Sequence, residues 1–293
     1  MKKKLRSLIT PLNGIYAVFI AAEIAIFIAF NVIVSRPVDD PVYLKYSGIL
    51  LCFAFAAVMI YFYRKDAIIL TCALLFTAIS DYFILVIDTY YEIGVTTFFV
   101  AQAIHFYRLY ANRINNYITV KKLKIRVIYI SLAVRAVIIA TIISVFAAVA
   151  SLNYLLIICT IYFTMLVGNC VDAFIICRGG WKNLLYAVGL LLFVGCDVCV
   201  ALHNASVLDL QLPSALLTFV QYAIWVFYLP AQVCIVSSAV KGGLMTEKQR
   251  VQAVATDSQA GTEQSEGVDR EYAQIEGESA VKEVEDDEGE EEF

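Results

Sequence analysis

Two aspartates, Asp81 and Asp197, stand deep inside strongly apolar stretches of the chain and in similar contexts. The residues that lead to them read Leu-Leu-Phe-Thr-Ala-Ile-Ser-Asp at 74–81 and Leu-Leu-Leu-Phe-Val-Gly-Cys-Asp at 190–197. A carboxylate near the centre of a bilayer costs roughly 2.5 to 3.5 kcal/mol on insertion scales, so such a residue usually faces a partner or a water-filled cavity. Two carboxyls in one site divide the roles of proton donor and of base or cation stabiliser, whereas intramembrane acids equally mark ion pathways.

The elements that must position these acids are membrane helices. Of the 293 residues, 61% are hydrophobic and only 16% are charged, which is more apolar than a soluble domain. We predict an all-α fold, a polytopic bundle of eight transmembrane helices, because long apolar blocks in lipid satisfy their backbone polar groups as helices. The blocks are 12–34, 44–63, 67–87, 93–111, 127–149, 153–177, 183–203 and 215–240.

The lysines and arginines between these blocks predict the orientation of the bundle. Nearly all of them fall in alternate connections, and only Arg36 and Lys45 lie on the opposite side. The positive-inside rule therefore places both termini in the cytoplasm. Asp81 and Asp197 then lie at about 21 Å from the cytoplasmic ends of their helices, in the outer half of the bilayer, where they can line one pocket.

The chain divides into a membrane domain, 1–245, and a tail, 246–293. From residue 246 onward there are sixteen Asp or Glu against four Lys or Arg, a net charge of −12, whereas the whole chain carries −4. We expect the acidic tail to be disordered and cytoplasmic, because it is too polar to bury a core. Within the membrane domain, the similarity around the two aspartates allows two parallel copies of four helices, a 4+4 repeat.

Further polar residues recur at helical spacing on the fourth and eighth blocks. This spacing places them on single helix faces, which we expect to turn toward the acids, although ordinary hydrogen bonding between helices is the alternative interpretation. These residues are Gln102 and His105 on the fourth block, and Gln221, Trp225, Tyr228 and Gln232 on the eighth.

Two other charged residues within the blocks predict a structural ion pair. Arg135 and Asp172 both lie near the cytoplasmic ends of their helices, so their side chains can meet at the inner interface. Glu23 lies near the middle of the first block, and the sequence assigns it no role.

Several chemistries are excluded or disfavoured. The chain lacks a phosphate-binding loop, a His-Glu-x-x-His zinc helix and a Gly-x-Ser-x-Gly elbow. Cys196, Cys199 and His203 share a helix face, but no convincing further ligand is nearby, so we expect neither a metal site nor a cofactor. The basic residues follow the topological pattern, and no nucleic acid partner is expected.

Four segments carry a family resemblance. Ser80-Asp81, the run Phe-Phe-Val-Ala-Gln-Ala-Ile-His at 98–105, the run 189–197 that ends in Asp197, and Tyr-Leu-Pro-Ala-Gln at 228–232 resemble the YhhN-like lysoplasmalogenase family, also called the transmembrane protein 86 family. The resemblance implies an eight-helix hydrolase that cleaves the vinyl ether bond of lysoplasmalogens into a fatty aldehyde and a glycerophospho-alcohol.

The resemblance also implies the site and the partner. Its catalytic residues would be Asp81 and Asp197, and its partner a membrane lysophospholipid of the vinyl ether type. We expect the protein to lie in the plasma membrane. The chemistry suits two acids, because protonation of the alkene carbon leaves an oxocarbenium ion that a carboxylate can stabilise before water attacks. The residues expected to line the substrate pocket are Gln102, His105, Trp225, Tyr228 and Gln232.

One departure from the family pattern keeps two other functions open. The family commonly has His where this chain has Gln102, and Tyr where it has His105. Because an amide does not donate a proton in the usual pH range, either His105 substitutes one turn along or the fourth helix is not catalytic. The alternatives are a small-molecule or proton-coupled carrier and a noncatalytic relative of the enzymes.

Overall fold

The computed structural model describes residues 2–34, 41–62, 64–110, 121–149, 152–176, 181–204 and 212–240. All regular structure in these ranges is helical, which confirms the all-α prediction; the predicted acidic tail, 246–293, lies outside the described residues. The elements are α1 (Lys2–Val34), α2 (Val42–Phe62), α3 (Arg64–Asp81), a π-helix η1 (Tyr82–Ile87), α4 (Tyr91–Arg108), α5 (Lys121–Val149), α6 (Tyr154–Ile176), α7 (Trp181–His203) and α8 (Ser214–Ser237).

Seven of the described helical segments are long and apolar enough to cross a membrane. The exception is α4, whose 18 residues include several polar side chains. Three of these, Gln102, His105 and Arg108, are at most 1% exposed. These polar side chains of α4 therefore face the inside of the bundle and not the lipid. The chain is a multi-pass membrane protein, whereas the eighth span and the cytoplasmic position of both termini stay predictions.

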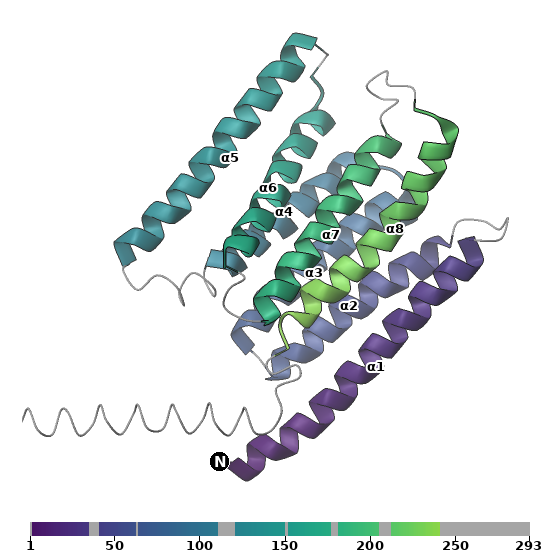
Figure 1. Cartoon of the computed structure of the whole chain (residues 1–293), viewed down its shortest axis with the longest axis vertical. Helices are drawn as coiled ribbons and strands as arrows, with labels where there is room; N and C mark the ends of the chain where they lie inside the picture. The colour runs from purple at the N-terminus through teal and green to yellow at the C-terminus, as the bar shows by residue number, and fades with distance from the viewer. Residues whose placement is uncertain are drawn as a thin grey trace, which may run out of the picture. The chain divides into compact units, whose positions relative to one another are not determined.

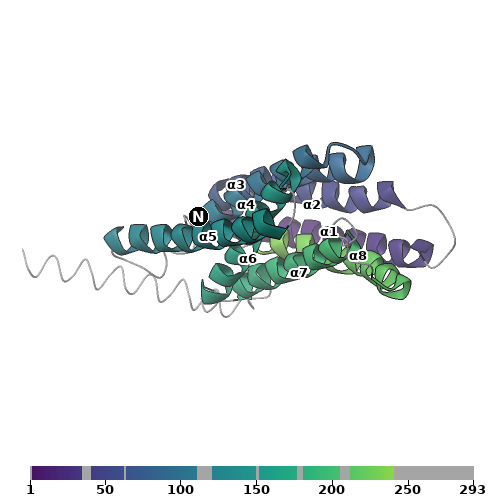
Figure 2. The same cartoon turned by 90° about the horizontal axis from the view of Figure 1, so that it is seen from above.

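Six helices form a closed ring: α2 packs against α3, α3 against α4, α4 against α6, α6 against α7, α7 against α8, and α8 against α2. Outside the ring, α1 packs on α2 and α8, and α5 packs on α6 at the edge of the bundle (Figures 1 and 2). Successive helices run in opposite directions. We call the end at which α2, α4, α6 and α8 begin the distal end, and the opposite end the proximal end.

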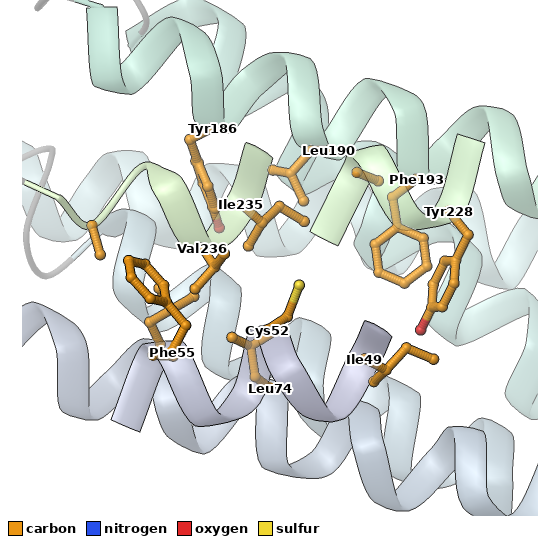
Figure 3. Close-up of a cluster of buried hydrophobic side chains, with 14 of the residues drawn as sticks. Ile49, Cys52, Phe55, Leu74, Tyr186, Leu190, Phe193, Tyr228, Ile235 and Val236 are labelled. Atoms are coloured by element: carbon orange, nitrogen blue, oxygen red, sulfur yellow. The ribbon is translucent and has the colours of Figure 1, made fainter. Parts of the chain in front are cut away.

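Apolar side chains pack much of the interior of the ring. Figure 3 shows Ile49, Cys52 and Phe55 of α2 facing side chains of α7 and α8. Because lipid tails are as apolar as these side chains, the packing and not the removal of water holds membrane helices together, and small residues allow close approach. At Gly189 of α7 an added Cβ would lie 2.8 Å from Cγ1 of Ile235 and 3.0 Å from the carbonyl oxygen of Ala231, so only glycine permits this contact with α8.

Candidate functional site

Asp81 is the last residue of α3 and is 3% exposed, and the chain continues directly into the π-helix η1. Short π-helical segments are frequent at functional sites. The neighbouring Ser80 donates its hydroxyl to the carbonyl oxygen of Gly94 at 2.5 Å, which ties the end of α3 to the first turns of α4. A Cβ at Gly94 would lie 2.5 Å from Cγ1 of Ile84, so glycine is required for this contact. The position of Asp81 is therefore fixed by two helices.

The turn between η1 and α4 adopts a special backbone conformation. Asp88 and Tyr90 both have left-handed backbones, with φ of 52° and 59°. Tyr91 donates its hydroxyl to Oδ1 of Asp88 at 2.6 Å, and this hydrogen bond raises the pKa of Tyr91, because the ionised phenolate would lose the bond and face the carboxylate. The turn fixes where α4 begins and hence the depth of its inward-facing residues.

Tyr228 of α8 meets Asp81 inside the ring. Its hydroxyl donates to Oδ2 of Asp81 at 2.5 Å. Two aromatic side chains pack against the Tyr228 ring, Phe193 of α7 at 5.3 Å and Trp225 of α8 at 5.6 Å between ring centres. Figure 3 shows Phe193 and Tyr228 side by side in the core. The prediction that Trp225 and Tyr228 turn inward is confirmed by their burial.

Asp197 of α7 approaches the same interior from the other side. It interacts electrostatically with Asp81 and with Tyr162 of α6. The Tyr162 hydroxyl is the hydrogen-bonding neighbour of the Asp197 carboxyl, although among the described residues neither this hydroxyl nor Oδ2 of Asp197, both buried, makes a hydrogen bond of ordinary geometry. Phe98 of α4 closes this side, at 5.6 Å from Tyr162. Asp81, Asp197, Tyr162 and Tyr228 are called the acid site below.

Two glutamines lie one helical turn from the acid site toward the proximal end. Gln102 follows Phe98 by four residues on α4, and Gln232 follows Tyr228 by four on α8, which is about 6 Å along each helix. Both are at most 1% exposed. Nε2 of Gln102, and both Nε2 and Oε1 of Gln232, have no hydrogen-bond partner among the described residues. Because buried amides normally find partners, these groups are available to bind a small polar molecule.

The chain is similar to the proteins of a known family. The family model of the YhhN family matches residues 41–239, from the first turn of α2 to the end of α8. The chain belongs to the YhhN family. Comparisons with curated proteins and with solved structures gave no match. The match covers the whole ring and both acids.

In this YhhN protein His105 lies away from the acids. It is seven residues beyond Phe98 on α4, about 10 Å toward the proximal end, and its Nδ1 lies 3.2 Å from the Tyr186 hydroxyl. The Tyr186 ring also lies under the guanidinium of Arg108, at 4.9 Å. Arg108 donates to both carboxylate oxygens of Asp66, each at 2.8 Å. His105 therefore belongs to a proximal network that joins α3, α4 and α7.

The predicted ion pair between Arg135 and Asp172 is confirmed, with a distance of 2.6 Å from Nη2 to Oδ2. Asp172 also accepts hydrogen bonds from Tyr110 and Ser131. The pair attaches α5 to α6. Arg135 further donates to Asn169, and the amide of Asn169 donates to Oε1 of Gln102 at 3.1 Å. Gln102 is thus held on one side by α6 while its Nε2 remains unpaired.

One residue of the predicted inward face of α8 was placed wrongly. Gln221 was grouped with Trp225, Tyr228 and Gln232 on one face of α8, but Gln221 is exposed. The other three are buried where α8 packs against its neighbours, whereas most side chains in the first turns of α8 remain uncovered. A face defined by helical spacing is buried only along the part of the helix that has a neighbour.

Sequence reasoning also missed several buried residues of the site and its surroundings. Tyr162 and Phe193 are aromatic residues in apolar runs and give no signal that separates them from lipid-facing ones. Arg108 and Asp66 did offer a signal, since opposite charges stand at the adjoining ends of two consecutive antiparallel helices. Within the described part of the chain, no group of three His, Cys, Asp or Glu gathers as a metal site.

Proposed function

We propose that this YhhN protein is a lysoplasmalogenase, a hydrolase of the plasma membrane that cleaves the vinyl ether bond of lysoplasmalogens to a fatty aldehyde and a glycerophospho-alcohol. One observation carries the proposal: two carboxyls from α3 and α7 interact inside a closed helix ring, among aromatic side chains. A carboxyl pair of this kind supplies the acid and the cation stabiliser that vinyl ether hydrolysis requires.

The different partners of the two acids divide the roles between them. Asp81 accepts the hydrogen bond from Tyr228, which holds its carboxyl in place, so Asp81 is suited to lie against a cation and stabilise it. Oδ2 of Asp197 makes no hydrogen bond of ordinary geometry among the described residues, and the neighbouring Tyr162 hydroxyl leaves this carboxyl available to deliver a proton. Asp197 transfers its proton to the alkene carbon, and the oxocarbenium ion that results lies against the carboxylate of Asp81.

Water then completes the reaction. As water attacks the oxocarbenium carbon, Asp81 takes one of its protons, which gives a hemiacetal. The hemiacetal collapses when Asp81 returns that proton to the ether oxygen and Asp197 removes the proton of the hemiacetal hydroxyl. Both acids are thereby restored to their starting states, and one water has been consumed for each aldehyde released.

The two buried glutamines are suited to hold the attacking water. Gln102 and Gln232 present unpaired amide groups one turn from the acids, and a bound water would satisfy them. His105 is bound to Tyr186 about two turns below Phe98, and so it does not replace the family histidine. In this proposal α4 contributes binding and not proton transfer.

A second function, a proton-coupled carrier, is favoured by a different observation. Buried polar groups recur at successive levels from the acid site through Gln102 to His105 and Arg108 near the proximal end. Chains of polar groups within a membrane protein also occur in proton pathways. A carrier would show substrate-dependent proton flux in liposomes.

Purified protein incubated with a lysoplasmalogen, and in parallel with an ester lysophospholipid, tests the proposal. We expect fatty aldehyde from the first substrate and no fatty acid from the second. The matched controls are D81N and D197N, prepared in the same detergent. Fatty acid without aldehyde would redirect the function to an esterase, and proton flux without either product to a carrier. A protein with none of these activities would be a noncatalytic relative.

A further inference from the structure

Arg135 belongs to α5, outside the ring, but its guanidinium is held in one place against α6. Its Nη2 lies 2.6 Å from Oδ2 of Asp172, and its Cζ lies 4.6 Å from the centre of the Phe106 ring of α4. A Cβ at Gly168 of α6 would overlap Nε of Arg135 and lie 2.8 Å from its Cζ, so this glycine leaves the room that the guanidinium occupies. From this position Nη2 also donates to Oδ1 of Asn169 at 3.3 Å.

The contact with Arg135 determines the orientation of the Asn169 amide. A guanidinium carries only N–H donors, so the atom of Asn169 that faces it must be the amide oxygen. A second contact agrees: Nδ2 lies 2.9 Å from the backbone carbonyl oxygen of Gln102, which can only accept a hydrogen bond. Two partners of known polarity, one on each side, therefore give Asn169 the same orientation.

The Asn169 nitrogen in turn determines how the Gln102 side chain is oriented. Nδ2 of Asn169 lies 3.1 Å from this side chain, and because an amide nitrogen only donates, the facing atom of Gln102 is Oε1. Nε2 is left on the other side of the amide, in a residue that is 0% exposed, and it has no hydrogen-bond partner among the described residues. A chain of donors thus runs from Arg135 to Gln102 and ends in an N–H group about one turn from the acid site.

We propose that Gln102 is a fixed hydrogen-bond donor that binds the oxygen of the attacking water and keeps it until it leaves as the aldehyde oxygen. Arg135 acts through Asn169 as the positioning residue. This inference rests on the proposed function, in which the water oxygen becomes the hydroxyl oxygen of the hemiacetal and then the carbonyl oxygen of the aldehyde. That oxygen offers a lone pair to Nε2 at each stage. Gln232, whose two amide groups are both unpaired among the described residues, can also accept from the water.

A fixed donor at Gln102 gives this part of the site a preference for carbonyl ligands. An aldehyde or ketone offers only an acceptor, whereas an alcohol can either accept or donate. N169D reverses the polarity with little change in shape. The carboxylate still accepts from Arg135 but can no longer donate to Gln102, so Nε2 of Gln102 turns toward it and Oε1 turns toward the acid site.

Titration of a long-chain methyl ketone, and of the fatty alcohol of equal length, into purified wild type and N169D tests the inference without turnover. In N169D we expect the Kd of the ketone to rise about tenfold and that of the alcohol to change less than about twofold. N153D is the matched control, because Asn153 is exposed before α6 and a carboxylate can also accept the hydrogen bond from the Leu156 amide.

Variants of Arg135 test its role as the positioning residue. R135M leaves only the backbone carbonyl of Gln102 to orient Asn169, so the Kd of the ketone should rise by a smaller factor, about threefold, while that of the alcohol stays unchanged. R135K again presents only donors and should restore ketone binding. Failure of R135K to restore it, or an equal loss of both ligands in R135M, would remove Arg135 from this role.

The infrared carbonyl stretch of the bound ketone separates this inference from the proposed function. A hydrogen bond lowers this frequency relative to the same ketone in hydrocarbon, so we expect a lowered frequency in wild type and a higher one in N169D. That result supports the inference even if wild type releases no aldehyde from lysoplasmalogens. The inference is overturned if wild type binds no ketone, if its bound ketone shows the frequency of a free carbonyl, or if N169D changes both ligands alike or neither. Aldehyde release together with a free carbonyl frequency would leave the hydrolase standing without this donor.

Discussion

The two halves of the ring domain, α1–α4 and α5–α8, occupy corresponding places but treat their acids differently. In each half the first helix lies outside the ring and the next three belong to it. The third helix of each half carries the aspartate, and Tyr46 and Tyr162 precede Asp81 and Asp197 by the same number of residues. This correspondence favours the 4+4 repeat, which stays a prediction.

The fourth helix of each half, α4 and α8, shows one way in which the two halves differ. Phe-Phe-Val-Ala-Gln at 98–102 corresponds to Tyr-Leu-Pro-Ala-Gln at 228–232, so Phe98 stands where the second half has Tyr228. The hydroxyl that Phe98 lacks is the group that binds Asp81. The two carboxyls therefore have different hydroxyl neighbours, Tyr228 of α8 for Asp81 and Tyr162 of α6 for Asp197. Unequal carboxyls are what a division into acid and cation stabiliser requires.

Neutralising either acid should have the largest effect. D81N and D197N keep the shape of the side chain but neither exchange the proton nor carry the charge, so we expect aldehyde release to fall at least about 100-fold in each. Both variants should still insert and fold, because a neutral amide is less costly to bury than a carboxylate. Retention of more than about half the wild-type rate in either variant would remove that carboxyl from the mechanism.

Removing the hydroxyl that distinguishes the halves should have the next largest effect. Y228F makes the α8 position resemble Phe98 and deprives Asp81 of its hydrogen bond, so kcat should fall about tenfold with little change in KM. The converse variant, F98Y, tests whether the asymmetry itself matters. If Y228F retains full kcat, the Tyr228 hydrogen bond does not divide the roles of the acids.

The packing of the second half can be disturbed separately from its chemistry. G189A places a Cβ against the α8 backbone, so an overpacking cost of about 1 to 3 kcal/mol should lower the unfolding temperature. Gly195, on the same helix, is the control, because its Cβ would lie 3.6 Å from the Phe227 ring, at ordinary contact distance. Equal thermal shifts in G189A and G195A would contradict the close α7–α8 contact.

The smallest effect is expected from restoring the family residue on α4. Q102H introduces an imidazole next to Asn169, one turn from the acid site, and should preserve aldehyde release or raise it a few-fold, as measured by initial rates. N169A provides the comparison, since it removes the amide that holds Gln102 without adding a titratable group. Loss of activity in Q102H alone would show that the amide at this position is required.

The sequence by itself determined the helical elements and the position of each acid along its helix, whereas the depth of the acids in the bilayer stays a prediction. Apolar length predicts the helices because lipid leaves the backbone few other structures, and a fixed rise per residue then gives the depth of each polar residue. The pairing of Arg135 with Asp172 followed from depth alone. The position of Gln221 along its helix could not show that this side chain is exposed. Whether a helix face is covered depends on a neighbouring helix, which the helix's own sequence does not specify.

Only the tertiary structure decided which residues meet across the ring. Asp81 and Tyr228 are separated by 147 residues, and their hydrogen bond depends on the closure of α8 against α2. Nothing in the apolar runs distinguishes Tyr162 or Phe193 from aromatic residues that face lipid. Helical periodicity orients a side chain relative to its own helix, whereas the packing of whole helices against one another sets which side chains share the interior.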